Sequence, residues 1–89
     1  MRLLSAAAGN VQTDEETLLA FHHAGWIKVA SKNGHSFVSG QDEYRSRFIL
    51  HLRKKMNLTD HQIGIVLENG KAPYSLEQVP SILATYSAD

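Results

Sequence analysis

The pattern of apolar and polar positions in the first part of the chain predicts two short helices joined by a tight turn. Residues 3–8 favour a helix, and Gly9-Asn10 follows them as a stop signal. Residues 13–16 read Thr-Asp-Glu-Glu, a capping box in which Thr13 is the cap and the last Glu reaches back to it. Apolar residues at helical spacing extend the second helix to about residue 24, where Gly25 can adopt a left-handed cap. This order is typical of a helix-turn-helix unit.

A β-hairpin is predicted directly after the second helix. Residues 26–30 alternate in character, residues 35–39 form a second β-prone segment, and Asn33-Gly34 lies between the two. Asn-Gly is a strong hairpin signal because both central turn positions require a positive φ. A two-stranded hairpin is marginally stable alone, so we expect it to lean on the helices as a wing. The side chains expected to make that contact are Trp26, Ile27 and Phe37.

Three more helices are predicted in the second half. The longest opens with the Ser-x-x-Asp sequence of residues 39–42 and runs to about residue 56. Its apolar stripe, expected to face the core, comprises Tyr44, Phe48, Leu52 and Met56, with Ile49 beside them. Residues 59–62 form another capping box and begin a short helix that stops at Asn69-Gly70. Residues 75–78 can cap a last helix.

The predicted fold class is therefore mainly α, a winged helix-turn-helix of four to five short helices with a two-stranded β-hairpin wing. We expect the winged domain over residues 1–70, with residues 71–89 forming a short C-terminal helix and tail that pack on or extend it. A chain of 89 residues is long enough for one domain.

Composition narrows the possible functions. The chain has no cysteine, which excludes disulfides and thiol nucleophiles, and no apolar run long enough to cross a membrane, so a cytoplasmic location is the default expectation. Its five histidines lack metal-ligand spacing, and no phosphate loop or nucleophile elbow is present. We therefore expect no enzymatic activity, cofactor, metal or small-molecule substrate.

The order of the elements resembles the MerR-type winged-helix domain. The resemblance is carried by Ala-Gly-Trp-Ile-Lys-Val at residues 24–29, by Asn33-Gly34, and by Arg-x-Arg-Phe-Ile-x-x-Leu-Arg at residues 45–53. Within that superfamily the chain is most similar to the chaperone-modulator (CbpM-like) branch, through residues 13–18, 35–37, 51–58 and 63–67. It departs from that branch at His35, where the branch has Trp, and in a Pro-interrupted C-terminal segment. The resemblance implies binding to, and inhibition of, the J-domain of a DnaJ-like co-chaperone.

The second helix carries the expected partner-binding residues. Three carboxylates begin this helix, and no Arg or Lys lies between Arg2 and Lys28, so the helix should attract a basic protein surface. The predicted contacts are Asp14, Glu15, Glu16, Leu19, Phe21 and His22. The carboxylates also have a purely structural reading as helix caps.

DNA binding is the alternative, as a MerR-like transcriptional regulator or an excisionase-type accessory protein. Its candidate contacts are Lys28, Lys32, Arg45, Arg53, Lys54 and Lys55. The net charge of zero counts against it, since phosphate neutralisation dominates the affinity of DNA-binding proteins. The wing also reads Gly-His-Ser at residues 34–36, without the cation that MerR-type wings carry there.

Overall fold

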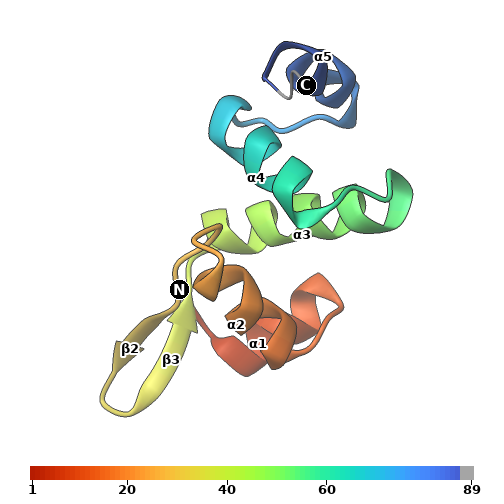
Figure 1. Cartoon of the computed structure of the whole chain (residues 1–89). Helices are drawn as coiled ribbons and strands as arrows, with labels where there is room; N and C mark the ends of the chain where they lie inside the picture. The colour runs from red at the N-terminus through yellow and green to blue at the C-terminus, as the bar shows by residue number, and fades with distance from the viewer. Residues whose placement is uncertain (87–89) are drawn as a thin grey trace. The chain divides into compact units, whose positions relative to one another are not determined.

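The computed structural model describes residues 1–86, and the prediction of a C-terminal tail after them lies outside the described residues. These residues are 63% helical, with five α-helices and a small antiparallel sheet (Figure 1). The elements in chain order are β1 (Arg2–Leu3), α1 (Leu4–Val11), α2 (Glu15–His23), β2 (Ala30–Lys32), β3 (His35–Val38), α3 (Gly40–Lys55), α4 (Asp60–Asn69), the 3-10 turn η1 (Leu76–Gln78) and α5 (Val79–Tyr86). This content is compatible with a helix-turn-helix bearing a wing. None of the helices in residues 1–86 is both long and apolar enough to cross a bilayer.

The chain divides into two compact units, Met1–Arg47 and Phe48–Asp89, and α3 contributes a segment to each. The first unit contains the helix pair and the sheet, and the second contains α4, η1 and α5. Within the second unit α5 contacts α4.

Helix α1 does not stop at Gly9-Asn10 as predicted but continues to Val11. The reversal comes instead at Gln12, which is left-handed with φ 65° and whose N–H bonds to the carbonyl of Gly9. The extra turn places Val11 in line with the other buried residues of the helix: Leu4, Ala7 and Ala8. Burial of that side chain outweighs the weak stop signal, because helix ends follow tertiary packing as well as local propensity.

The predicted capping box has Thr13 as the N-cap of α2, but the N-cap in the structure is Asp14. Its Oδ1 accepts a hydrogen bond from the Thr17 backbone N–H at 2.7 Å. Thr13 is engaged by the preceding helix, since its N–H bonds to the Ala8 carbonyl at 2.9 Å. Cap position therefore depends on where α1 ends. The predicted glycine cap is confirmed, because Gly25 has φ 80°.

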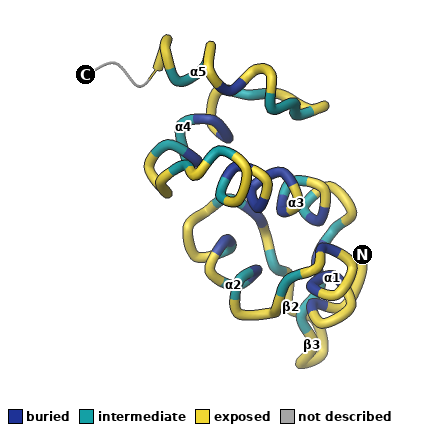
Figure 2. The backbone as a smooth tube through the Cα atoms, turned by 90° about the vertical axis from the view of Figure 1, so that its right-hand side faces the viewer, coloured by how far each residue is buried: buried dark blue, intermediate teal, exposed yellow. Residues whose placement is uncertain are grey.

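The sheet has three strands in the order β1-β3-β2, so the two-stranded wing prediction missed β1. The predicted Asn33-Gly34 turn is confirmed, with φ values of 52° and 78°. Strand β2 begins at Ala30, not at Trp26 as predicted. Residues 26–29 are tied to α2 instead: the Trp26 N–H bonds to the Phe21 carbonyl, and the Val29 N–H bonds to His22. All three residues of β2 are exposed (Figure 2).

Helix α3 begins as predicted, with Ser39 Oγ accepting from the Asp42 N–H at 3.1 Å. The predicted apolar stripe is wrong at Tyr44, which is 42% exposed. In the first unit the buried positions of α3 are polar, Glu43 and Ser46, and they lie one helical turn apart. The hydrogen bonds of Glu43, described below, explain why a polar position can replace the predicted apolar one.

The second unit is organised by apolar side chains from α3, α4 and α5. The predicted capping box at the start of α4 is confirmed, with the Thr59 and Gln62 side chains each bonded to the other's backbone N–H. Ser75 caps η1 rather than α5 itself. The rings of Phe48 and Tyr74 stack with centroids 4.8 Å apart. Buried apolar residues of this unit are Phe48, Ile49, Leu50, Leu52, Ile63, Val66, Leu67 and Val79.

Candidate functional site

The surface of α2 that is turned away from the core carries the predicted acidic residues. Leu18 and Phe21 face inward, so residues at other helical angles are left for solvent or a partner. Glu15 and Glu16 are exposed in the first turn, and Leu19, one turn later, is partly exposed. Since residues three or four apart are neighbours on a helix, Leu19 lies beside both glutamates. An apolar side chain is thus combined with two carboxylates on one small patch.

Asp14 extends this acidic surface from the cap position. Hydrogen bonds from the Thr17 side chain and then from the Thr17 backbone N–H hold the pKa of the Asp14 carboxyl below its usual value. The carboxylate is exposed and stays ionised across the neutral range. It therefore caps the helix and contributes negative charge to the surface at the same time.

Two of the predicted partner-binding residues have structural roles. Phe21 is completely buried and its ring lies 5.7 Å from that of Trp26, so it is a core residue rather than a surface anchor. His22 is partly buried, and its Nδ1 accepts a hydrogen bond from the Val29 N–H at 3.2 Å. The histidine thereby holds the segment that links α2 to β2. The remaining candidates on the surface are Asp14, Glu15, Glu16 and Leu19.

The predicted DNA-binding residues are distributed over both units. In the first unit Lys28 and Lys32 are exposed, while Arg45 is partly buried and donates from Nε to the Trp26 carbonyl. In the second unit Arg53 pairs with Asp60 at 3.2 Å, and the two lysines that follow it, Lys54 and Lys55, are exposed. Arg45 and Arg53 thus make protein contacts.

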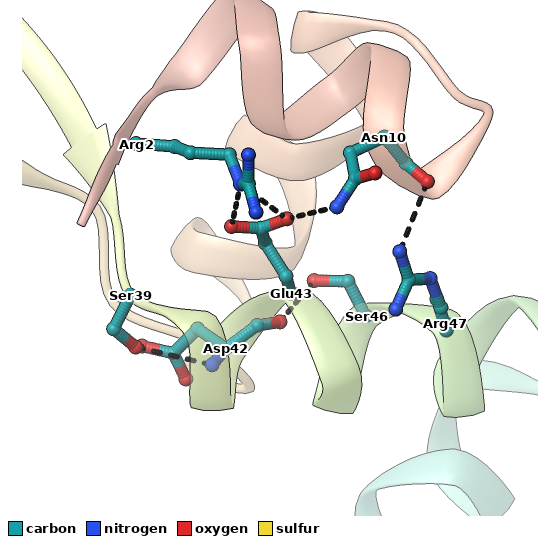
Figure 3. Close-up of polar contacts among 7 residues, drawn as sticks. All are labelled: Arg2, Asn10, Ser39, Asp42, Glu43, Ser46 and Arg47. Carbon is teal, nitrogen blue, oxygen red and sulfur yellow. Dashed lines mark hydrogen bonds and ion pairs between the residues drawn. The ribbon is translucent and has the colours of Figure 1, made fainter.

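The sequence pattern did not predict that Glu43 would be a buried carboxylate. It is 4% exposed and accepts hydrogen bonds from Arg2 Nε at 2.8 and 3.1 Å and from Asn10 Nδ2 at 2.7 Å (Figure 3). Burial raises the pKa of Glu43. The hydrogen bonds from Asn10 and Arg2 and the charges of Arg2 and Arg47 lower it by more, so the net pKa lies below its ordinary value. Arg47 also donates to the Asn10 carbonyl at 3.1 Å.

This cluster joins β1 and α1 to the first part of α3. Both carboxylate oxygens of Glu43 accept hydrogen bonds, which favours a role in holding the structure together over acid–base chemistry. The only sequence signal for it is the helical spacing of Glu43 with Ser46, since Glu43 otherwise resembles any carboxylate in the first turn of a helix.

Within residues 1–86 no three His, Asp or Glu side chains are grouped so that they could hold a metal ion. Comparison with known proteins does not supply a family: no family model, characterised protein or solved structure matches the chain. What the chain binds must therefore be inferred from the surface residues described above.

Proposed function

We propose that this chain is a small non-enzymatic adaptor with a MerR-like winged helix-turn-helix fold, which binds a protein partner through α2 and modulates it. The observation that carries the proposal is the exposed acidic surface of α2, formed by Asp14, Glu15 and Glu16 beside the partly exposed Leu19. In helix-turn-helix domains the second helix is the one presented to the bound macromolecule. Here α1 and α2 are that pair, and the β2–β3 hairpin is the wing.

The charge of this helix favours a protein partner over DNA. A recognition helix in the major groove lies close to the phosphates of both strands. The three carboxylates at the N-terminus of α2 would be repelled by those phosphates. The same carboxylates accelerate encounter with a basic surface and exclude acidic ones. Leu19 supplies apolar area that can be buried at the centre of such a contact.

The partner that fits this surface is a protein with a basic helical face, and we propose the J-domain of a DnaJ-like co-chaperone. The support is the resemblance of residues 13–18, 35–37, 51–58 and 63–67 to the chaperone-modulator branch, together with the basic helical face that J-domains carry. Binding on that face would block the contacts a J-domain makes there, which is how a non-enzymatic adaptor could act as an inhibitor.

The test is a double charge reversal, Glu15→Lys with Glu16→Lys, titrated calorimetrically against a purified J-domain. We expect binding to weaken by at least about tenfold at low salt, and the difference to shrink as salt is added. The matched control is Glu68→Lys with Glu77→Lys, which makes the same change at exposed glutamates of the second unit. Equal affinity of all three proteins at low salt would refute docking through α2.

A second candidate function, DNA binding through the wing, is favoured by one observation. Lys28 and Lys32 are exposed, form no ion pair with any residue among 1–86, and lie in a stretch, residues 17–41, without Asp or Glu. A gel-shift series with random duplex at low salt decides between the two, because counterion release favours binding most under that condition. Retardation that disappears in Lys28→Gln with Lys32→Gln would support DNA; no retardation would eliminate it.

A further inference from the structure

The register of the three-stranded sheet assigns each strand residue to one of two faces. Leu3 and Ala30 are both cross-strand partners of Phe37, while Arg2 pairs with Val38. Directly paired residues lie on the same face, and successive residues on opposite faces. Leu3, Phe37 and Ala30 therefore form one continuous row across all three strands, on the face opposite to Arg2 and Val38.

The face that contains Arg2 and Val38 is the inner one. Val38 is completely buried, and the Arg2 side chain reaches Glu43 on α3 (Figure 3). Strand β3 also contacts helix α1 within the first unit. The row of Leu3, Phe37 and Ala30 is therefore on the outer face of the sheet.

The outer face is apolar at its centre and open to solvent. Leu3 is 45% exposed, Ala30 is exposed, and Phe37 between them is partly buried. The next row toward the hairpin turn is the cross-strand pair of Lys32 and His35, both exposed, which lie on the same face because they are two residues from Ala30 and Phe37. The apolar row is thus bordered by the Lys32 ammonium group and the His35 imidazole.

No carboxylate belongs to this sheet. Residues 1–13 and 17–41, which include all three strands and the β2–β3 hairpin turn, contain no Asp or Glu. The outer face therefore has the opposite charge character to the α2 surface, and a partner suited to one is repelled by the other.

We propose that the outer face of the sheet is a second docking surface, which binds an acidic segment of another protein through an apolar anchor. The anchor packs on the Leu3–Phe37–Ala30 row, and carboxylates beside it face Lys32. This site goes beyond the α2 contact and would add a second specificity to the adaptor. Nucleic acid is the poorer occupant, because its backbone offers phosphates to cations but no apolar group that would bury the central row.

The alternation of side chains along β2 supplies a sharp test. Ala30→Glu places a carboxylate in the apolar row, whereas Ser31→Glu makes the same charge change at the next exposed residue, on the opposite face. Peptides selected from a phage-displayed random library on the full chain serve as probes. We expect selected peptides to combine Asp or Glu with an aromatic or aliphatic residue.

Affinities of the selected peptides are then compared among variants. Ala30→Glu should weaken binding by at least about tenfold and Lys32→Glu by about fivefold, while Ser31→Glu leaves it nearly unchanged. Amide chemical-shift changes in the unaltered chain should centre on residues 2–3, 30–32 and 35–38. Failure of the library to enrich acidic peptides, or equal loss in Ala30→Glu and Ser31→Glu, would overturn the proposal. Two further results would also overturn it: duplex DNA that competes with the peptides, and self-association that Ala30→Glu abolishes.

Discussion

The Nε atom of Arg2 lies 2.8 Å from Oε2 of Glu43, across 41 positions of sequence. Because Arg2 belongs to β1, which pairs with β3, this contact couples the edge strand β1 to the first part of α3. Asn10 bonds to the other carboxylate oxygen from the end of α1. One buried carboxylate therefore holds a strand and two helices of the first unit together.

Glu43→Gln should lower the free energy of unfolding by roughly 1–3 kcal/mol, since hydrogen bonds that satisfied a buried charged group are lost. Most of the loss should arise at the buried carboxylate, because Arg2 is 55% exposed and its charge is screened by solvent. Urea unfolding at neutral pH measures the effect. Glu68→Gln, at an exposed position, is the control, and equal stabilities of the two variants would refute the clamp.

Glu43 should also make stability depend on acid. Its folded pKa lies below the ordinary value of 4.5, so the folded state retains the carboxylate after the unfolded chain has taken up its proton. The contribution is complete above pH 4.5 and is lost as pH falls through the folded pKa. The stability difference between the unaltered chain and Glu43→Gln should therefore narrow in that range. A difference that stays constant there would contradict the assignment.

Two glycines should respond to alanine with opposite signs. Gly34 has φ 78°, so Gly34→Ala strains the hairpin turn and should cost about 1 kcal/mol, although space for the methyl group is open. Gly9 lies inside α1 with equally open space, so Gly9→Ala should stabilise by roughly 0.5–1 kcal/mol. Thermal unfolding of the two variants provides the comparison. A loss of stability in both would show that α1 does not continue through Gly9.

Removal of the α4 cap should destabilise the second unit. Thr59→Ala eliminates the acceptor for the Gln62 N–H and should cost about 1 kcal/mol. Thr85→Ala is the matched control, because that hydroxyl donates to the Ser81 carbonyl within a helix, where alanine is the better helix former. Urea titration followed by circular dichroism distinguishes them. Losses of the same size would indicate that the capping box contributes nothing specific.

Features governed by a few neighbouring residues were predicted from the sequence. The Asn33-Gly34 turn, the Ser39 cap of α3 and the Thr59 capping box all occur as expected. Each depends on hydrogen bonds or φ values within three or four residues, so the local residue types determine it. The acidic first turn of α2 was recognised on the same basis.

Features that depend on distant residues could not be predicted in this way. The N-terminal strand β1 has only two residues, and its pairing with β3 is set by the fold rather than by propensity. The burial of Phe21 moved a predicted contact residue into the core, and Tyr44 was assigned inward although it is exposed. Helical periodicity defines a face of a helix but not which neighbour will cover it.

The sequence by itself determined where most helices and the hairpin turn lie, and that the chain has an acidic second helix and a strand region without carboxylates. Only the tertiary structure decided that Glu43 is buried against Arg2 and Asn10, and that Leu3, Phe37 and Ala30 line up across one face of the sheet. The physical reason is the separation along the chain between the residues that interact. Caps and turns are stabilised within one turn of chain, whereas a buried ion pair and a sheet face require contacts between segments that only folding brings together.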